Sequence, residues 1–350
     1  MELSGIIHFL KKYDGPQLKF MEVCGTHTSS IAKSGIRSLI SPKIRLISGP
    51  GCPVCVTPAA YIDKCIGYAF TENHVLVTFG DMMKVPGSAE SLSEAKSRGG
   101  RVELMYSPFE VLEKAAENTG TTYIIAAVGF ETTAPVYALL LKEAGAKGLK
   151  NIKLLTALKS IAPALSWICE NEKKIDGFIC PGHVSVITGA GAYEKLSTRY
   201  GKPFVIAGFE PEHILAGVCE LILMSSGEKQ PGMSNLYRSA VKDGGNVKAQ
   251  GAIAEYFKTG DAMWRGIGII ENSGYYLKEK YAGYDGGSFG LDGDTEFPDG
   301  CRCADIIAGR ADPGECSMFG VSCTPQNPFG PCMVSAEGAC GIWFQNTGKR

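Results

Sequence analysis

The sequence predicts an α/β fold with two parallel-sheet domains and a small C-terminal domain that depends on metal-bound cysteines. Between about residues 40 and 225, short runs rich in β-branched residues alternate with helical stretches, which is typical of parallel sheets covered by helices on both faces. From Tyr281 onward this alternation is gone, and Gly, Pro, Asp and Cys dominate. A segment of roughly 70 residues with this composition cannot form a conventional core and needs a cross-link to hold it folded. In a reducing compartment, bound metal is the natural cross-link.

Seven strands are predicted in the alternating region, at 43–48, 74–79, 102–106, 122–128, 151–157, 176–180 and 203–209. Six helices are predicted between them, at 57–70, 91–99, 107–119, 133–145, 162–173 and 190–201. One sheet could hold all seven strands, but a break near 118–121 favours two domains, at 1–120 and 121–225. The third domain, 226–350, begins with a helix and a candidate strand, at 247–260 and 264–273.

The 350 residues carry almost balanced charge, with 35 Lys and Arg against 36 Asp and Glu and a net charge of −1. We therefore expect no nucleic acid partner, because proteins that bind nucleic acids usually carry a basic surface. The start of the chain lacks the pattern of a secretory signal, and the apolar runs are shorter than the roughly 20 residues that span a bilayer. We expect a cytoplasmic protein that does not insert into a membrane. In that reducing compartment, the 13 cysteines favour metal binding or redox chemistry over structural disulfides.

Cys52 and Cys55 form a CxxC motif in GPGCPVCVTP, between the strand at 43–48 and the helix that follows it. We expect Thr57 to cap that helix and Pro58 to be its first residue. A thiol at a helix N-terminus has a lowered pKa, which is the arrangement used for thiol–disulfide exchange. The alternative is half of a four-cysteine zinc site, but no second pair with matching spacing lies nearby.

Two other motifs supply candidate site residues. Cys24 and His27 lie three residues apart in MEVCGTHTSS and could face one cation or one reactive centre, with ordinary burial as the alternative. Glu131 in GFETTAP and His183 in PGHVS each follow the end of a predicted strand, at the edge where open α/β sheets bind their ligands. Glu131 could instead be an acid favoured at the start of its own helix, and His183 an ordinary turn residue.

Six cysteines gather within 40 residues near the C-terminus, at Cys301, Cys303, Cys316, Cys323, Cys332 and Cys340. Four thiolates are what a [4Fe–4S] cluster requires. A four-cysteine zinc site is the competing interpretation, although such sites usually show two closely spaced pairs. Spacing alone leaves open which four would bind. The other cysteines stand in apolar segments and are expected to be small core residues: Cys65, Cys169, Cys180 and Cys219.

Taken together, MEVCGTHT, GPGCPVCVTP, GFETTAP, PGHVS and CTPQNPFGPCMVSAEGAC resemble the motifs of the HypD family of hydrogenase maturation factors, in the same order over nearly the whole chain. The resemblance implies two Rossmann-like α/β domains and a C-terminal [4Fe–4S] domain. The family signature has four cysteines separated by 14, 6 and 16 residues, which here selects Cys301, Cys316, Cys323 and Cys340. Cys303 is the alternative to Cys301 as a ligand of the cluster. Ser29 stands where many members have a second histidine.

The resemblance also implies a function, the assembly of the Fe(CN)2(CO) group of [NiFe]-hydrogenases. Cys24 would hold the Fe(II) that carries cyanide and CO as transient cargo, since a thiolate is a suitable soft ligand. HypC would share that iron and HypE would donate the cyanide. Cys52 and Cys55 would cycle between dithiol and disulfide, while the C-terminal cluster relays electrons.

His27, Glu131 and His183 are the remaining candidates for chemistry in this scheme, as groups that position ligands or move protons. The chain would then be an assembly scaffold with redox activity rather than a conventional turnover enzyme. The first alternative is an iron–sulfur-dependent disulfide reductase whose CxxC acts on a diffusible substrate. A second alternative is a zinc-stabilised α/β binding protein.

Overall fold

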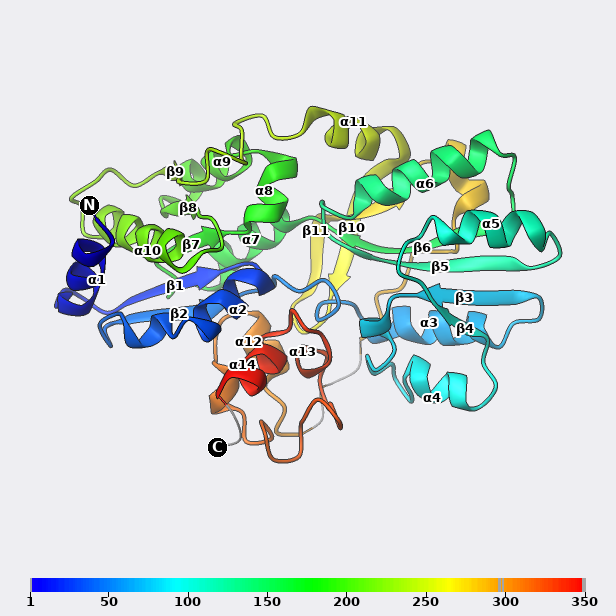
Figure 1. The fold of residues 1–350 in the computed structure, drawn as a ribbon, viewed down its shortest axis with the longest axis horizontal. Coiled ribbons are helices and arrows are strands. Elements are labelled where there is room, and N and C mark those ends of the chain that lie inside the picture. Colours follow the sequence, from blue (N-terminus) through cyan, green and yellow to red (C-terminus); the bar gives the residue numbers. More distant parts are fainter. Residues whose placement is uncertain (1, 295–296, 298, 348–350) are drawn as a thin grey trace.

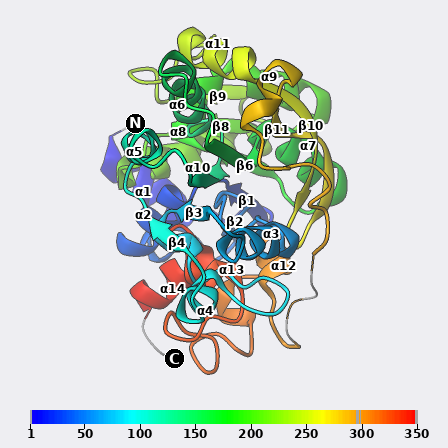
Figure 2. The same cartoon turned by 90° about the vertical axis from the view of Figure 1, so that its right-hand side faces the viewer.

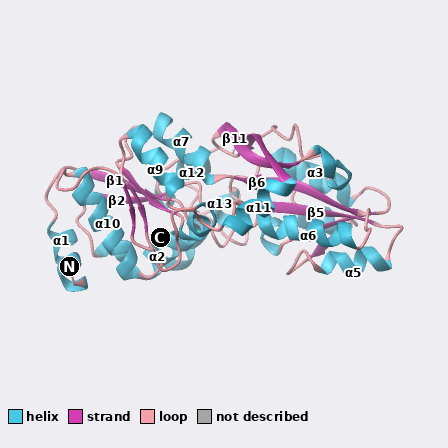
Figure 3. Cartoon of the chain, turned by 90° about the horizontal axis from the view of Figure 1, so that it is seen from above, coloured by secondary structure: helices cyan, strands magenta, loops and turns pink. Residues whose placement is uncertain are grey.

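Two separate sheets, placed one after the other along the longest axis of the molecule, form the framework of the chain (Figures 1 and 3). The computed structural model describes residues 2–294, 297 and 299–347. One sheet has five parallel strands, and the other has six, of which four are parallel. The predicted α/β class with two parallel-sheet units is therefore confirmed. Among the described residues, no helix has both the length and the apolar character needed to cross a membrane.

The five-stranded sheet has the order β2-β1-β7-β8-β9. Its strands are β1 (Leu18–Glu22), β2 (Ile44–Ser48), β7 (Gly177–Cys180), β8 (Phe204–Ile206) and β9 (Met233–Asn235). Alternate side chains enter different cores: Phe20 packs in the core with Leu10 and Ile214, and Met21 in the core with Ile168 on the opposite face. The helices on the two faces are α1 (Leu3–Lys12), α2 (Gly25–Lys33) and α10 (Pro211–Ser225) on one, and α7 (Ile161–Asn171) and α9 (Gly191–Tyr200) on the other.

The six-stranded sheet has the order β10-β11-β6-β5-β3-β4. Its parallel strands are β3 (His74–Thr78), β4 (Val102–Leu104), β5 (Thr122–Gly129) and β6 (Ile152–Lys159). The hairpin of β10 (Phe257–Trp264) and β11 (Gly268–Leu277) adds to β6 in the antiparallel direction. Five helices cover this sheet, namely α5 (Glu110–Glu117), α6 (Ala134–Ala146) and α11 (Val247–Tyr256) on one face, and α3 (Ala59–Ala69) and α4 (Leu92–Ser97) on the other.

The two sheets do not follow the expected ranges 1–120 and 121–225. The chain builds β1 and β2 in one sheet, crosses to build β3 to β6 in the other, returns for β7 to β9, and crosses again for the hairpin. The break near 118–121 lies between α5 and β5 of the same six-stranded sheet. A strand's own residues show that it is buried but not which strand it pairs with. The pairing of Met21 with Phe178 therefore had no local signature.

All seven predicted strands are present, with shorter or shifted ends in several cases. The prediction missed β1 and β9, whose sequences LKFME and MSN contain no β-branched residue. The predicted helix at 247–260 ends at Tyr256, because the chain continues directly into β10. The candidate strand at 264–273 corresponds to β11, displaced to 268–277. Helices α1, α2, α10 and α8 (Gly182–Thr188) were not predicted.

The cysteine-rich segment after about residue 300 packs beneath the five-stranded sheet, on the side of the molecule opposite to α11 (Figures 1 and 2). It contains three short helices, α12 (Cys303–Ile307), α13 (Pro331–Val334) and α14 (Ala339–Thr347). Gly309 lets it approach closely: its φ is +72°, and a Cβ there would lie 2.8 Å from Ile47 Cδ1. A larger residue at that position would be strained by the positive φ and would require the ends of the Met21 and Ile47 side chains to move.

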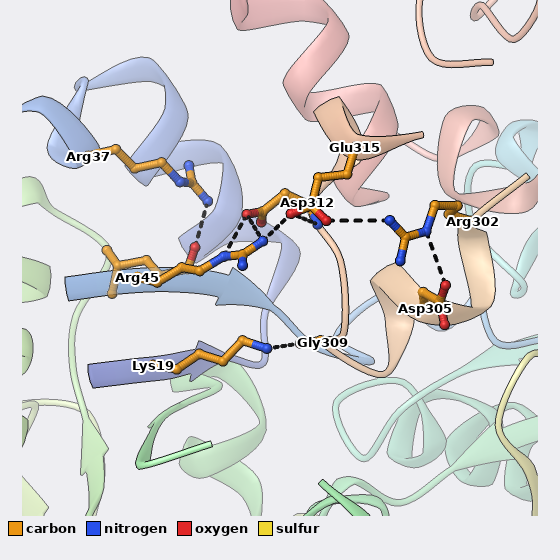
Figure 4. Close-up of polar contacts among 9 residues, drawn as sticks. Lys19, Arg37, Arg45, Arg302, Asp305, Gly309, Asp312 and Glu315 are labelled. Carbon is orange, nitrogen blue, oxygen red and sulfur yellow. Dashed lines mark hydrogen bonds and ion pairs between the residues drawn. The ribbon is translucent and has the colours of Figure 1, made fainter. Parts of the chain in front are cut away.

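Charged side chains of β1 and of the edge strand β2 anchor the segment (Figure 4). Arg45 of β2 donates two hydrogen bonds to Asp312, at 2.8 and 3.0 Å, and also contacts Glu315. Lys19 of β1 donates to the carbonyl of Gly309 at 2.8 Å. Arg302 extends the network to Glu315 at 3.4 Å. Because this network joins β1 and β2 to the segment, it fixes the cysteines relative to the strands that lead into the CxxC motif.

Candidate functional site

Cys24 lies at the junction of β1 and α2, where it is the residue that caps the helix. Its N–H donates to Glu22 Oε2 at 3.2 Å, and its carbonyl accepts from the N–H of Thr28 at 3.0 Å. The residue is half-buried, and burial raises the pKa of its thiol to about 11. The free thiol therefore stays protonated near neutral pH, and a metal ion that binds it must displace the proton.

Glu22 belongs to this junction as well, although the sequence analysis did not select it. Its side chain is 1% exposed, and Oε1 accepts a hydrogen bond from Thr28 Oγ1 at 2.5 Å. Burial raises the pKa of Glu22 to about 7. The signal that could have revealed it is one acidic residue inside the otherwise apolar run FMEV, since a buried carboxylate needs specific partners.

Cys52 and Cys55 form a disulfide in the turn between β2 and α3. The N–H of Cys55 donates to Cys52 Sγ at 3.1 Å, and the two residues are 6% and 2% exposed. The expected cap is wrong by one residue: Pro58 caps α3 and Ala59 begins it, because the Thr57 hydroxyl donates to a carbonyl within the turn. The N–H group that donates to the Cys52 sulfur is that of Cys55, which lies in the turn before the helix.

Cys24 and the CxxC turn lie directly against each other. β1 and β2 are parallel, with Glu22 paired with Ser48, so their carboxyl ends meet at one edge of the sheet. Gly51, which precedes Cys52, packs on the backbone of Cys24: a Cβ on Gly51 would lie 2.6 Å from the Cys24 nitrogen. The edge therefore brings together the first two cysteine motifs of the sequence.

His27 and His183 come from different elements at the same edge and meet through Phe209. The ring of Phe209 lies 4.8 Å from that of His27 and 4.3 Å from that of His183. His27 is fully buried, with Nε2 3.1 Å from the carbonyl of Gly208, and burial lowers its pKa to about 4. Its imidazole is therefore neutral at physiological pH, whereas His183 at the start of α8 is exposed.

Glu131 follows β5 in the other sheet and is also buried, with 1% exposure. Its Oε1 accepts from Ser160 Oγ at 2.7 Å and from the N–H of Ile161 at 2.9 Å, which is the first residue of α7. Burial raises its pKa. Glu131 thus stabilises the start of α7 rather than that of its own following helix, and its described hydrogen bonds do not reach Cys24 or the CxxC turn.

All six C-terminal cysteines line one small apolar cavity, together with Ile306, Phe319, Gly330 and Met333. The glycine gives the sulfurs room, because a Cβ on Gly330 would lie 3.2 Å from the sulfurs of both Cys301 and Cys303, which is a tight contact. Cys323 Sγ accepts the N–H of Phe329 at 3.4 Å. The structure therefore gathers the four cysteines selected by the family signature and adds Cys303 and Cys332. The isolated cysteines Cys65, Cys169, Cys180 and Cys219 are buried core residues, as predicted.

The donor set of this cavity fits an iron–sulfur cluster, because such clusters are held by cysteine sulfurs and the lining offers six. Across the described part of the chain, no three His, Cys, Asp or Glu side chains converge on one point as the ligands of a single ion do. A [4Fe–4S] cube distributes four thiolates over four iron atoms, so its ligands do not have to meet at one point.

A second cavity connects the CxxC turn with the cysteine-rich segment. Cys52, Cys55 and Cys332 line it together, and Cys55 Sγ lies 3.8 Å from the carbonyl of Pro331. Cys332 therefore borders both cavities. Its position could not be predicted from spacing, because it depends on how the segment docks beneath β1 and β2.

The chain is similar to known proteins over nearly its whole length. The family model described as "HypD: Hydrogenase formation hypA family" matches residues 3–347. "Hydrogenase maturation factor HypD" of Escherichia coli (strain K12) is 40% identical over 332 residues, which cover 94% of this chain and 89% of that protein. The protein of the same name from Rhodobacter capsulatus is 39% identical over 338 residues, again with 94% and 89% covered. That from Azotobacter vinelandii is 38% identical over 338 residues, with the same coverage.

Proposed function

Because the chain belongs to the HypD family of hydrogenase maturation factors, we propose that it is the scaffold on which the Fe(CN)2(CO) group of [NiFe]-hydrogenase is assembled. It would work in the cytoplasm, in a complex with HypC and HypE. The observation that carries this proposal is the packing of Gly51 on Cys24, because it sets a candidate iron ligand beside a redox-active pair. An assembly site needs both when the iron and its ligands are delivered in separate steps.

Cys24 is the residue we propose to bind the iron. It is half-buried at a sheet edge, so a partner protein can reach it, and it is not committed to a disulfide. Fe(II) with cyanide and CO ligands favours a soft thiolate donor. Metal binding would release the thiol proton, whose pKa is about 11 in the free protein. HypC would contribute a second contact to the iron, and HypE would supply the cyanide.

The CxxC pair is proposed to store two electrons. Reduction of the Cys52–Cys55 disulfide takes up two electrons and two protons and gives two thiols. The N–H of Cys55, at 3.1 Å from Cys52 Sγ, would stabilise Cys52 as a thiolate in the reduced pair. Both sulfurs are almost fully buried, which favours an electron source inside the molecule over a large diffusible disulfide substrate.

We propose that the electron source is a [4Fe–4S] cluster held by the family quartet, Cys301, Cys316, Cys323 and Cys340. Such a cluster, when bound, transfers electrons one at a time. Cys332 borders both the cluster cavity and the CxxC cavity, so it connects the two. Cys303, beside Gly330, is the nearest alternative to Cys301 as a ligand.

The other three candidates would have supporting roles. His27 is neutral and buried, and through Phe209 it contacts the exposed His183. We propose that His183 orients cargo or a partner at this edge, with His27 holding the edge in place. Glu131, bound to the first turn of α7, would act by positioning that helix.

The test is to isolate the chain anaerobically from cells that also produce HypC and HypE, and to record infrared spectra. The proposal predicts bands of iron-bound cyanide and CO on the complex, together with iron in excess of that held by the cluster. A complex that forms but shows neither band would refute the scaffold role. A disulfide reductase would show disulfide turnover without these bands.

A further inference from the structure

The cavity beside the CxxC turn has one acidic residue among its described lining residues, Glu337. The rest of the lining consists of the three cysteines, two hydroxyl residues (Thr28 and Ser48) and glycine, proline or aliphatic residues. Neither the sequence motifs nor the proposed scaffold function gives this glutamate a role. A proton acceptor beside a buried thiol pair would have a role in the redox chemistry of that pair.

Glu337 is fixed in place by the loop between α13 and α14. A Cβ on Gly25, the first residue of α2, would lie 2.6 Å from Glu337 Cβ and 2.7 Å from its carbonyl oxygen. The N–H of Glu337 donates to Ser335 Oγ at 3.2 Å. Because the loop rests on the glycine next to Cys24, Glu337 lies at the meeting point of the cysteine-rich segment and the site edge.

The cysteine pair needs such a group, because its sulfurs have little contact with water. Cys52 and Cys55 are 6% and 2% exposed, whereas Glu337 is an exposed residue that also lines their cavity. A proton that leaves the pair can therefore reach solvent through Glu337. General acid–base groups must lie within reach of the proton and have a pKa near the working pH.

We infer that Glu337 accepts the proton of the Cys52 thiol when the thiolate forms and returns it when the thiol forms again. In the forward step the S–H bond of Cys52 breaks, the electron pair stays on sulfur and the proton moves to the Glu337 carboxylate. No oxidant is consumed. The inference rests on the proposed dithiol–disulfide cycle and assigns its proton transfer. Cys52 is the thiol concerned because its sulfur accepts the N–H of Cys55.

The charges around Glu337 agree with this role. Glu337 is exposed as a residue, but partial desolvation of its carboxyl group raises its pKa, and the negative charge of Asp81, in the short turn Gly80–Met82, raises it further. Behind Thr28 lies Glu22, whose pKa is itself raised to about 7 by burial. The described residues that line the cavity include no cation. A raised carboxyl pKa narrows its difference from the thiol pKa, which favours proton transfer from the thiol to the carboxylate.

The experiment compares the wild type with Glu337→Gln, Glu337→Asp and Asp81→Asn in the full-length protein. Dithiothreitol reduces the Cys52–Cys55 disulfide, and the released thiols are followed against pH. Iodoacetamide alkylation gives the apparent pKa of Cys52. Glu337→Gln removes a negative charge near the thiol, so the apparent pKa of Cys52 should fall. Reduction of the disulfide at pH 7 should nevertheless slow at least about tenfold, because the proton donor to the leaving sulfur is lost.

If Glu337 had only a structural role, these two opposite changes would not be seen together. A lower pKa of Cys52 alone makes thiol–disulfide exchange faster, not slower. Glu337→Asp should retain more of the rate than Glu337→Gln, and Asp81→Asn should stay within about twofold of the wild type since it leaves the Glu337 carboxyl in place. A Glu337→Gln rate within twofold of the wild type, in a pair that still cycles, overturns the inference alone. A wild-type pair that does not cycle at all overturns the proposed function as well.

Discussion

Gly51→Ala is the substitution that most directly perturbs the packing of Cys24 against the CxxC turn. The added Cβ would lie 2.6 Å from both the Cys24 nitrogen and the Val23 carbonyl carbon, and 2.8 Å from the Cys24 Cα. These are backbone atoms of the two residues that follow β1, where the N–H of Val23 donates to the carbonyl of Ile179 in β7, so they cannot move aside as a flexible side chain would. Overpacking of this kind costs about 1–3 kcal/mol of the free energy of unfolding.

Gly67→Ala is the matched control, because the same substitution there meets nothing. Gly67 lies inside α3 with no atom within 4 Å of its added Cβ, so alanine should stabilise the protein by about 0.5–1 kcal/mol. Urea unfolding followed by circular dichroism should therefore shift in opposite directions for the two variants. Gly51→Ala should also lower hydrogenase maturation in a complemented strain, while Gly67→Ala should not. If Gly51→Ala is as stable as the wild type, the close contact described for Cys24 is wrong.

Three further outcomes are expected. The anaerobic protein should contain about four iron and four sulfide per chain, and Cys316→Ala or Cys323→Ala should remove most of both; stoichiometric zinc without sulfide would contradict the cluster. After reduction, alkylation against pH should show one of Cys52 and Cys55 reacting below the ordinary thiol pKa of about 8.5; two ordinary or zinc-blocked thiols would exclude the redox role. Burial lowers the pKa of Lys159 to about 7, so above that pH the unfolded chain binds more protons than the folded chain does. The free energy of unfolding should therefore rise by on the order of 3–5 kcal/mol between about pH 7 and 10. Lys159→Met should flatten that rise, and equal slopes for the two proteins would argue against a buried neutral amine.

The sequence was sufficient to predict the α/β class and the seven parallel strands, because buried strands leave continuous apolar runs. It did not predict the interleaving of the two sheets. The pairing of β1 with β7 depends on packing between segments far apart in the chain, and the sequence of neither strand indicates which strand it pairs with. The strand β1 itself was missed because LKFME lacks β-branched residues.

For the site, the motifs identified the cysteines but not their neighbours. Cys24 and the CxxC turn meet because two parallel strands end at one edge, which the alternation of strands and helices predicts in general terms. Cys332 and Glu337 reach the same place only through docking of the cysteine-rich segment, for which Gly309 and Arg45 are responsible. Such long-range contacts could not be read from spacing.

The proposed binding of iron by Cys24 is tested most directly by infrared spectroscopy of the complex with HypC, prepared from Cys24→Ala and, as the control, Cys65→Ala. Cys65 is a fully buried thiol of α3 with no place at the site edge, so its variant should keep the cyanide and CO bands and support maturation. Cys24→Ala should keep the fold and the C-terminal iron and sulfide, because Cys24 is not among the residues that line the cluster cavity, but lose both bands. If Cys24→Ala retains the bands and matures hydrogenase, Cys24 is not the iron ligand and the scaffold mechanism is wrong.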